Sequence, residues 1–296
     1  MSKTLLKGLL IAGLVLCLVL AAILWRRKEE PPPVMNTAVP AANTPRDVAY
    51  EAAVQSELLD CARTQGEEYV RRRDALVAKA RANPNGFRSA ATGSPGWEQR
   101  VLGEIVMEYV LREKEVQAFA DWVPAARRMK TREQYEPIRV YGADFAKHAR
   151  KVPMVLVESL WKGTNEKFRD EYSPISRVNQ QFVAQALGGL KERRAREVLE
   201  WLMNDIVLGT PDSANATAAR ALGVLGCPES VPALLAALEK GVDTGSALER
   251  CADASSLPLL RKVAATSSDE GMRATANDLI RYLETQPREG SERKER

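Results

Sequence analysis

Apolar residues recur every three to four positions along most of the chain, which is the spacing of one helix face. Between residues 47 and 82 this pattern predicts a helical segment whose inward side chains are Val48, Ala52, Leu58, Leu59, Ala62, Val70, Ala75, Leu76 and Ala80. A second segment starts at residue 97, and its predicted inward side chains are Val101, Leu102, Ile105, Val106, Tyr109 and Val110. No convincing strand-like alternation occurs in the sequence, so the pattern predicts an all-α fold.

Residues 83–96 interrupt the helical pattern. The stretch NPNGFRSAATGSPG is rich in proline, glycine and asparagine, which are typical of turns and loops. We therefore predict a loop here, inside a helical N-terminal region that covers residues 47–135.

The second half of the chain contains internal repeats, and repeats decide the fold before local patterns do. A stretch from Ala186 lies 35 residues before a similar stretch from Ala221. The pairs that coincide are Leu187 with Leu222, Gly188 with Gly223, Leu190 with Leu225, Val198 with Ala233, Leu199 with Leu234 and Met203 with Leu238. A third stretch, from Ala247, matches at an offset of 26, and residues 152–163 resemble residues 231–241.

Each unit is predicted to be a short helix, a turn and a second helix. In the clearest unit the two helices are predicted at residues 215–225 and 230–240, with the turn at residues 227–230. Pro232 fits the first turn of the second helix, because the amide at that position has no helical partner to lose.

Small and polar residues add three details to this unit. Gly223 and Gly226 are expected to let neighbouring helices approach closely. Asn215 opens an Asn-Ala-Thr glycosylation sequon, but we interpret it as part of the first helical turn, capped by Asp212 or Ser213.

These units resemble HEAT repeats, in particular the short HEAT-like type first noted in phycobilin lyases. The resemblance covers residues 184–284 closely and residues 141–163 loosely, and we assign the repeats to residues 136–285. It implies an α-solenoid whose units are stable only when stacked, and a role in binding other proteins. It implies no lyase activity, since such repeats occur in many unrelated proteins and no bilin site can be mapped.

The N-terminus has the pattern of a membrane anchor. Residues 8–25 carry no charge and, as a helix, would span about 27 Å, close to the thickness of a bilayer core. Basic residues flank this span on both sides, within residues 1–28, and Trp25 lies where an interfacial aromatic would. A cleaved signal peptide is the alternative, but the apolar residues continue to the basic cluster, which favours an uncleaved transmembrane helix and a lipid-bilayer partner.

The orientation of the predicted span in the membrane is less clearly indicated by the sequence. The basic residues on the two sides of the span are nearly equal in number, so the short N-terminal tail decides the expectation. We expect a bacterial inner-membrane protein with one span and a periplasmic C-terminal domain; the same domain facing the cytoplasm is the alternative. A proline-rich linker is predicted at residues 29–46 and a disordered charged tail at residues 286–296.

The net charge of +4 belongs to the membrane flanks. Five of the 43 basic residues flank the predicted span, which leaves 38 against all 39 acidic residues of the chain. The remainder therefore lacks the basic surface of a nucleic-acid-binding protein, and we expect no nucleic-acid partner. One basic segment, residues 127–151, includes Arg127 and Arg128 and could bind an acidic partner or lipid headgroups; the alternative is a solvated helix face.

Catalytic patterns are weak. The chain has a single histidine, His148, and lacks both the Walker loop and the dinucleotide-binding loop. Ser159 and Lys162 match the S-x-x-K pattern, in which a lysine activates a serine nucleophile, but its usual companion motifs are missing. We therefore predict that the protein is not an enzyme and has no cofactor, metal or small-molecule substrate. The alternative is an enzyme with an unrecognised site in the helical domain, in residues 47–135 or at Ser159 and Lys162.

Two cysteines of the repeats could form a disulfide in an oxidising compartment. Cys251 occupies the inward position that Leu225 has in the preceding unit, whereas Cys227 begins the turn. Their spacing does not form a metal-binding pattern, and the sequence leaves their redox state open.

Together these features predict a membrane-anchored HEAT-repeat scaffold that mediates protein–protein interaction. We expect the second helices of the repeats to face the protein partner. The candidate partner-binding residues are Arg196, Glu200, Glu239, Arg261 and Lys262, together with Arg127 and Arg128.

Overall fold

Every regular element that the structure describes is a helix, and no strand occurs among these residues. The computed structural model describes residues 47–119, 121, 149–162 and 174–285, which belong to one unit that starts at Asp47. The all-α prediction is confirmed for this part of the chain. Within it, no helix is long and apolar enough to cross a membrane. The predicted span at residues 8–25, the linker and the charged tail lie outside the described residues.

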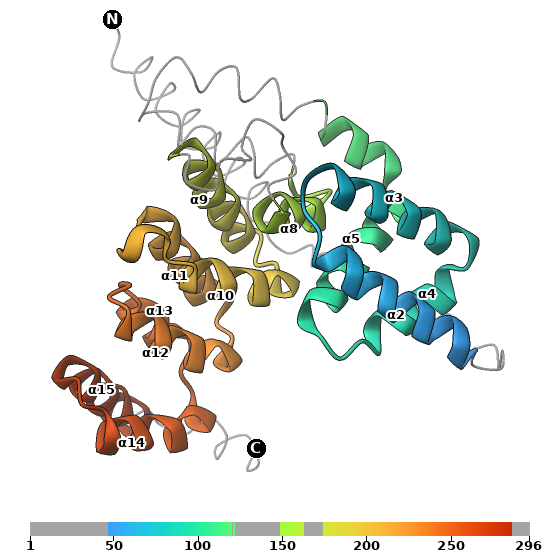
Figure 1. Ribbon diagram of the computed structural model, residues 1–296. Coiled ribbons are helices and arrows are strands. Elements are labelled where there is room, and N and C mark those ends of the chain that lie inside the picture. Colours follow the sequence, from blue (N-terminus) through green and yellow to red (C-terminus); the bar gives the residue numbers. More distant parts are fainter. Residues whose placement is uncertain (1–46, 120, 122–148, 163–173, 286–296) are drawn as a thin grey trace, which may run out of the picture. The chain divides into compact units, whose positions relative to one another are not determined.

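The N-terminal part includes the helices α2 (Val48–Ala62), α3 (Gly66–Ala82), α4 (Pro84–Thr92) and α5 (Trp97–Leu111) (Figure 1). They pack around an apolar core to which α5 contributes Leu102 and Val106. The adjacent face of α5, with Val101 and Ile105, belongs to a second core that continues through the repeats. Helix α5 therefore takes part in both cores. The expected domain boundary near residue 135 lies outside the described residues.

The loop predicted at residues 83–96 is wrong for most of its length, because α4 occupies Pro84–Thr92. The Asn83 side chain accepts the amide hydrogen of Gly86 at 3.1 Å and caps this helix. Pro84 then fits the first turn, where its missing N–H is not needed. Asparagine and proline thus begin a helix here, and Phe87 is buried on its inner face.

The inward positions predicted for residues 47–82 are partly wrong. Val48 is 69% exposed, and Ala52 and Ala75 are exposed as well. The segment is two helices, since the chain turns after Ala62 and restarts at Gly66 with a φ of +61°. This break resets the helical phase for α3, which contains Ala75, whereas Val48 and Ala52 lie before it, on the exposed side of α2.

The repeats are built from short helix pairs. Their helices are α8 (Pro153–Lys162), α9 (Pro174–Gly189), α10 (Arg196–Asn204), α11 (Ser213–Leu225), α12 (Val231–Glu239), α13 (Gly245–Cys251), α14 (Leu257–Thr266) and α15 (Glu270–Thr285). Helices α9 and α10, α11 and α12, and α13 and α14 form three successive units (Figure 1). The first helices α9, α11 and α13 contact one another in this order, α8 contacts the first unit, and α15 packs on α14.

A three-residue 3₁₀ turn precedes each second helix: η2 (Arg193–Ala195), η4 (Pro228–Ser230) and η5 (Ala254–Ser256). A fourth, η3 (Val207–Gly209), lies between α10 and α11. The structure also explains the change of offset from 35 to 26. Helix α13 has 7 residues against 13 in α11, and the connection before it (residues 240–244) is shorter than that before α11 (residues 205–212).

The helix–turn–helix prediction for residues 215–240 is confirmed by α11, η4 and α12. Asp212 caps α11 by accepting the amide hydrogens of Ala214 and Asn215, and Pro232 lies in the first turn of α12. The expectation for Gly226 needs correction. Its φ of +60° ends α11 in the left-handed conformation that favours glycine, so its role is to terminate the helix rather than to permit close packing.

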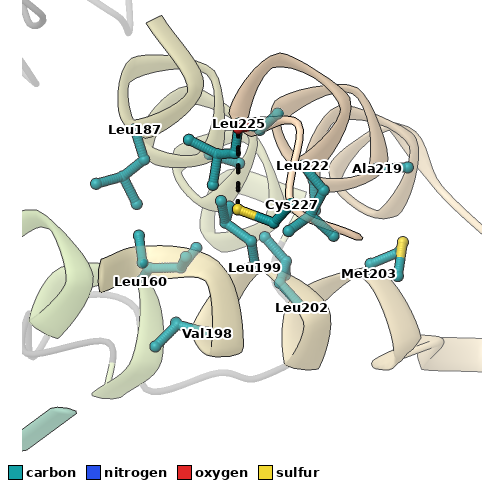
Figure 2. Close-up of a cluster of buried hydrophobic side chains, with 14 of the residues drawn as sticks. Leu160, Leu187, Val198, Leu199, Leu202, Met203, Ala219, Leu222, Leu225 and Cys227 are labelled. Carbon is teal, nitrogen blue, oxygen red and sulfur yellow. Dashed lines mark hydrogen bonds between the residues drawn. The ribbon is translucent and has the colours of Figure 1, made fainter. Parts of the chain in front are cut away.

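Gly188 and Gly223 do permit close packing between units. A methyl group on Gly188 would lie 2.9 Å from the Cα of Ala221, and one on Gly223 would lie 2.9 Å from the Cα of Ala247. Leucines of adjacent units share one apolar core, in which Figure 2 shows Leu187, Leu199 and Leu222. Stacking therefore creates the core that a single pair of helices lacks.

Arg177 and Asn215 connect the first unit to the second. The Arg177 guanidinium donates to the Asp212 carboxylate at 2.6 and 3.0 Å and to the Asp205 carbonyl at 3.2 Å. Asn215, fully buried, donates to the carbonyls of Leu202 at 2.8 Å and Asp205 at 2.9 Å. This places Asn215 in the first turn of α11, as predicted, and leaves the amide of the sequon inaccessible.

Candidate partner-binding surface

The exposed sides of α10, α12 and α14, here called the second-helix surface, carry the five partner-binding candidates predicted in the repeats. On α10, Arg196 pairs with Glu200 at 2.9 Å. Glu200 also accepts a hydrogen bond from the Ser230 hydroxyl at 2.7 Å, which ties α10 to the turn before α12. Both side chains are only partly exposed. Glu200 therefore connects adjacent units and Arg196 pairs with it inside α10, a structural role that their sequence positions did not reveal.

The other three candidates are exposed. Glu239 ends α12, and Arg261 and Lys262 follow one another in α14. Arg261 pairs with Glu284 of α15 at 2.8 Å, across two solvent-exposed side chains. Such an exposed pair contributes little stability and exchanges readily for a ligand. Arg127 and Arg128 lie outside the described residues.

The structure does not assemble Ser159 and Lys162 into a nucleophile and base. The Ser159 hydroxyl donates to the carbonyl of Val155 in its own helix at 3.0 Å. The Lys162 ammonium donates to the carbonyls of Ala62 and Thr64 at the end of α2, the latter at 3.1 Å. Lys162 therefore anchors α8 to α2, and burial lowers the pKa of its ammonium.

A buried polar network around Glu158 fixes α8 on the N-terminal helices. Glu158 is 1% exposed and its carboxylate accepts from Arg73 at 2.6 Å, the Tyr69 hydroxyl at 3.1 Å and the Tyr109 hydroxyl at 2.5 Å. Burial and the adjacent Glu158 carboxylate raise the pKa of both tyrosines, so their hydroxyls stay protonated as donors. The Arg73 guanidinium also lies 4.4 Å from the centre of the Tyr109 ring. The sequence signal that could have indicated this network is Glu158, a lone glutamate within the apolar stretch VPMVLVESLW.

Glu108 of α5 makes a second polar contact with α8. Its carboxylate accepts the amide hydrogen of Val155 at 2.9 Å, in the first turn of α8, where free amides are available. Burial raises the pKa of Glu108 to about 7, although the Val155 and Met154 amides and the Arg194 charge oppose the shift.

A charged cleft, here called the junction cleft, lies between the N-terminal helices and the first repeat. It has a volume of about 190 Å³. Its lining residues come from α4, α5, α8, η2 and α10: Arg88, Ala91, Thr92, Arg100, Val101, Gly103, Glu104, Met107, Met154, Arg194 and Glu197. Sequence reasoning missed this cleft, because its residues come from five elements spread over more than one hundred positions.

Cys227 and Cys251 are free thiols in the structure, and both are buried. Cys227 lies 3.8 Å from the Leu225 carbonyl (Figure 2), and Cys251 donates to the Leu222 carbonyl at 3.3 Å. Burial raises the pKa of both thiols, that of Cys251 to about 11. Among the described residues, no cluster of histidine, cysteine or carboxylate side chains could hold a metal ion.

The comparisons with known proteins identify the repeat itself. The family model described as PBS lyase HEAT-like repeat matches residues 215–240, which are the residues of α11, η4 and α12 with their turn. No curated protein matches the chain, and no solved structure does. The match shows a HEAT-like repeat at residues 215–240, and the helix pairs stacked on both sides of this unit support a HEAT-like repeat protein.

Proposed function

We propose that this protein is a membrane-tethered scaffold that binds a protein partner on the second-helix surface of its HEAT-like repeats. HEAT-like repeats are in general protein-interaction scaffolds, since stacking forms an extended surface. The observation that carries the proposal is the exposure of Glu239, Arg261 and Lys262 on successive second helices above a filled core. A surface of this kind suits an extended protein segment.

The proposed tether is residues 8–25, with the proline-rich residues 29–46 as spacer. The uncharged span, its basic flanks and Trp25 support this part of the proposal. We place the helical domain on the periplasmic side of a bacterial inner membrane, because a short N-terminal tail usually stays in the cytoplasm.

The tether and its orientation are tested by cell fractionation. The full chain should remain in the membrane pellet after carbonate extraction, and a variant lacking residues 8–25 should not. Protease added to intact spheroplasts should degrade the helical domain. Protection in spheroplasts, with degradation after lysis, would instead place the domain in the cytoplasm, and extraction by carbonate would refute the tether.

The partner-binding surface is tested by site-specific photocrosslinking in membranes. A photoreactive amino acid replaces Glu239, Arg261 or Lys262 in the full chain, and adducts are identified by mass spectrometry. Arg220 of α11 and Glu249 of α13, exposed on first helices, serve as matched control positions. We expect the same partner at the three test positions and little at the controls. Equal adducts at all five positions would contradict a role for the second-helix surface.

A further inference from the structure

We propose that the junction cleft binds a segment of a protein partner in which one large apolar side chain is flanked by carboxylates. The proposal rests on the scaffold function above and adds a second contact, made outside the second-helix surface. The cleft combines an apolar floor, a charged rim with one unpaired arginine, and two further rim arginines that are held in place by neighbouring groups.

The floor of the cleft is apolar and closely packed. Ala91, Val101, Gly103, Met107 and Met154 form it. A methyl group on Gly103 would overlap the Cβ of Ala91, so α4 and α5 lie in direct contact beneath the cleft. Methionine side chains adapt to the shape of an apolar group. The volume of about 190 Å³ exceeds the roughly 150 Å³ that accommodates a benzene molecule.

The rim carries three arginines and two glutamates. Arg100 pairs with Glu197 at 3.3 Å, and Arg194 pairs with Glu104 at 3.4 Å. Arg88 is exposed and has no carboxylate partner within the described part of the chain. The rim therefore has one positive charge in excess, which is complementary to a carboxylate.

Two of the arginines are held in place by groups outside the cleft. Arg100 donates to the carbonyls of Ser94 at 3.2 Å and Pro95 at 3.0 Å. Arg194 donates to the carboxylate of Glu192 at 2.8 and 3.0 Å. Because none of these bonds involves Glu197 or Glu104, both guanidinium groups are positioned to receive a ligand carboxylate in place of those glutamates.

The chemistry of the cleft favours a peptide over a nucleic acid. A nucleic-acid site needs several free cations along a phosphate backbone, and two of the three arginines here are paired with glutamates. The methionine floor instead provides a site for an aliphatic or aromatic side chain between the charged positions. A protein segment supplies both parts from adjacent residues.

Selection from a random dodecapeptide phage library, with the full chain in nanodiscs as target, tests the proposal. We expect enriched peptides to combine a large apolar residue with neighbouring aspartate or glutamate. Synthetic peptides from the selection should bind at least tenfold more weakly to Arg88→Glu and lose affinity at high salt. Arg250→Glu, at an exposed position of α13, is the matched control and should bind normally.

Three outcomes would overturn the proposal: enrichment of basic or purely polar peptides, equal affinity for Arg88→Glu, or no enrichment. Circular dichroism on both variants checks that they fold. The photocrosslinking experiment on the second-helix surface uses other residues. If those adducts form while the library gives no acidic apolar peptide, the cleft assignment fails and the scaffold function stands.

Discussion

Gly188 of α9 lies directly against Ala221 of α11, and a Cβ on Gly188 would come within 2.9 Å of the Ala221 Cα. The same distance separates a Cβ on Gly223 from the Ala247 Cα one unit later. The first helices thus approach until backbone meets backbone, and only a glycine facing an alanine allows it. This contact is the structural basis of the repeated Leu-Gly pattern.

Gly188→Ala should destabilise the protein by about 1–3 kcal/mol, the cost of overpacking a closely packed interface. Gly189→Ala is the matched control, since no atom lies within 4 Å of a methyl group at this neighbouring position. It should be neutral or more stable by up to about 1 kcal/mol, because alanine favours the helix. Urea denaturation followed by circular dichroism measures both. Equal effects of the two substitutions would show that the contact is unimportant.

Replacing either partner of the buried Arg73–Glu158 pair should cost about 3–5 kcal/mol, because the remaining charge is left buried. The double variant Arg73→Met with Glu158→Leu should cost less than the sum of the two single variants. Urea midpoints of all four proteins give this coupling directly. Additive effects would mean that Arg73 and Glu158 stabilise α8 independently.

Glu108 should make stability fall as the pH rises. Its pKa is about 7 in the folded protein against 4.5 for an ordinary glutamate, so the folded state holds the proton more tightly. From about pH 4.5 to 7 the unfolded chain loses this proton first, and the free energy of unfolding decreases by roughly 3 kcal/mol through this group. Below pH 4.5 and above pH 7 the contribution is constant.

Glu108→Gln tests this dependence, since glutamine keeps an oxygen for the Val155 amide and cannot ionise. At pH 4.5 the variant and the unmodified protein should have similar free energies of unfolding. At pH 8 the variant should be the more stable of the two. Urea unfolding at both pH values gives the difference. An identical pH dependence for the two proteins would rule out Glu108 as its source.

Asn215→Asp should destabilise the repeats by about 3 kcal/mol despite its nearly equal shape. The substitution replaces an amide that donates to the carbonyls of Leu202 and Asp205 with a carboxylate that cannot donate at neutral pH. Asp212→Asn, which keeps a capping side chain, is the milder comparison. Thermal unfolding separates them, and a smaller loss for Asn215→Asp would contradict the donor role.

The repeats could be predicted because their signal is local and occurs several times. Leu222, Gly223 and Pro232 each have a counterpart at an offset of 35 or 26 residues, and each has a physical role that a short window reveals. Helix α4 was missed for the opposite reason. Asn83 and Pro84 occur in loops as well as at helix starts, and the burial of Phe87, which favours the helix, comes from distant residues.

The partner-binding residues could be predicted only in part. Helical periodicity distinguishes exposed from buried positions, and it placed Glu239, Arg261 and Lys262 on the surface. It could not show that Glu200 bonds to Ser230 of the next unit, nor that Arg88 and Arg194 line one cleft. Those relationships depend on how the helices stack.

The glycine–alanine contact also bears on how such a chain can change its length. Helices α9 and α11 each present the same surface to the unit that follows, so a duplicated unit inserted between them would find a compatible neighbour on either side. The contacts that α5 and α15 make at the two ends of the repeat array are not repeated elsewhere in the described part of the chain. Gene duplication could therefore lengthen the middle of the array while its two ends remain unchanged.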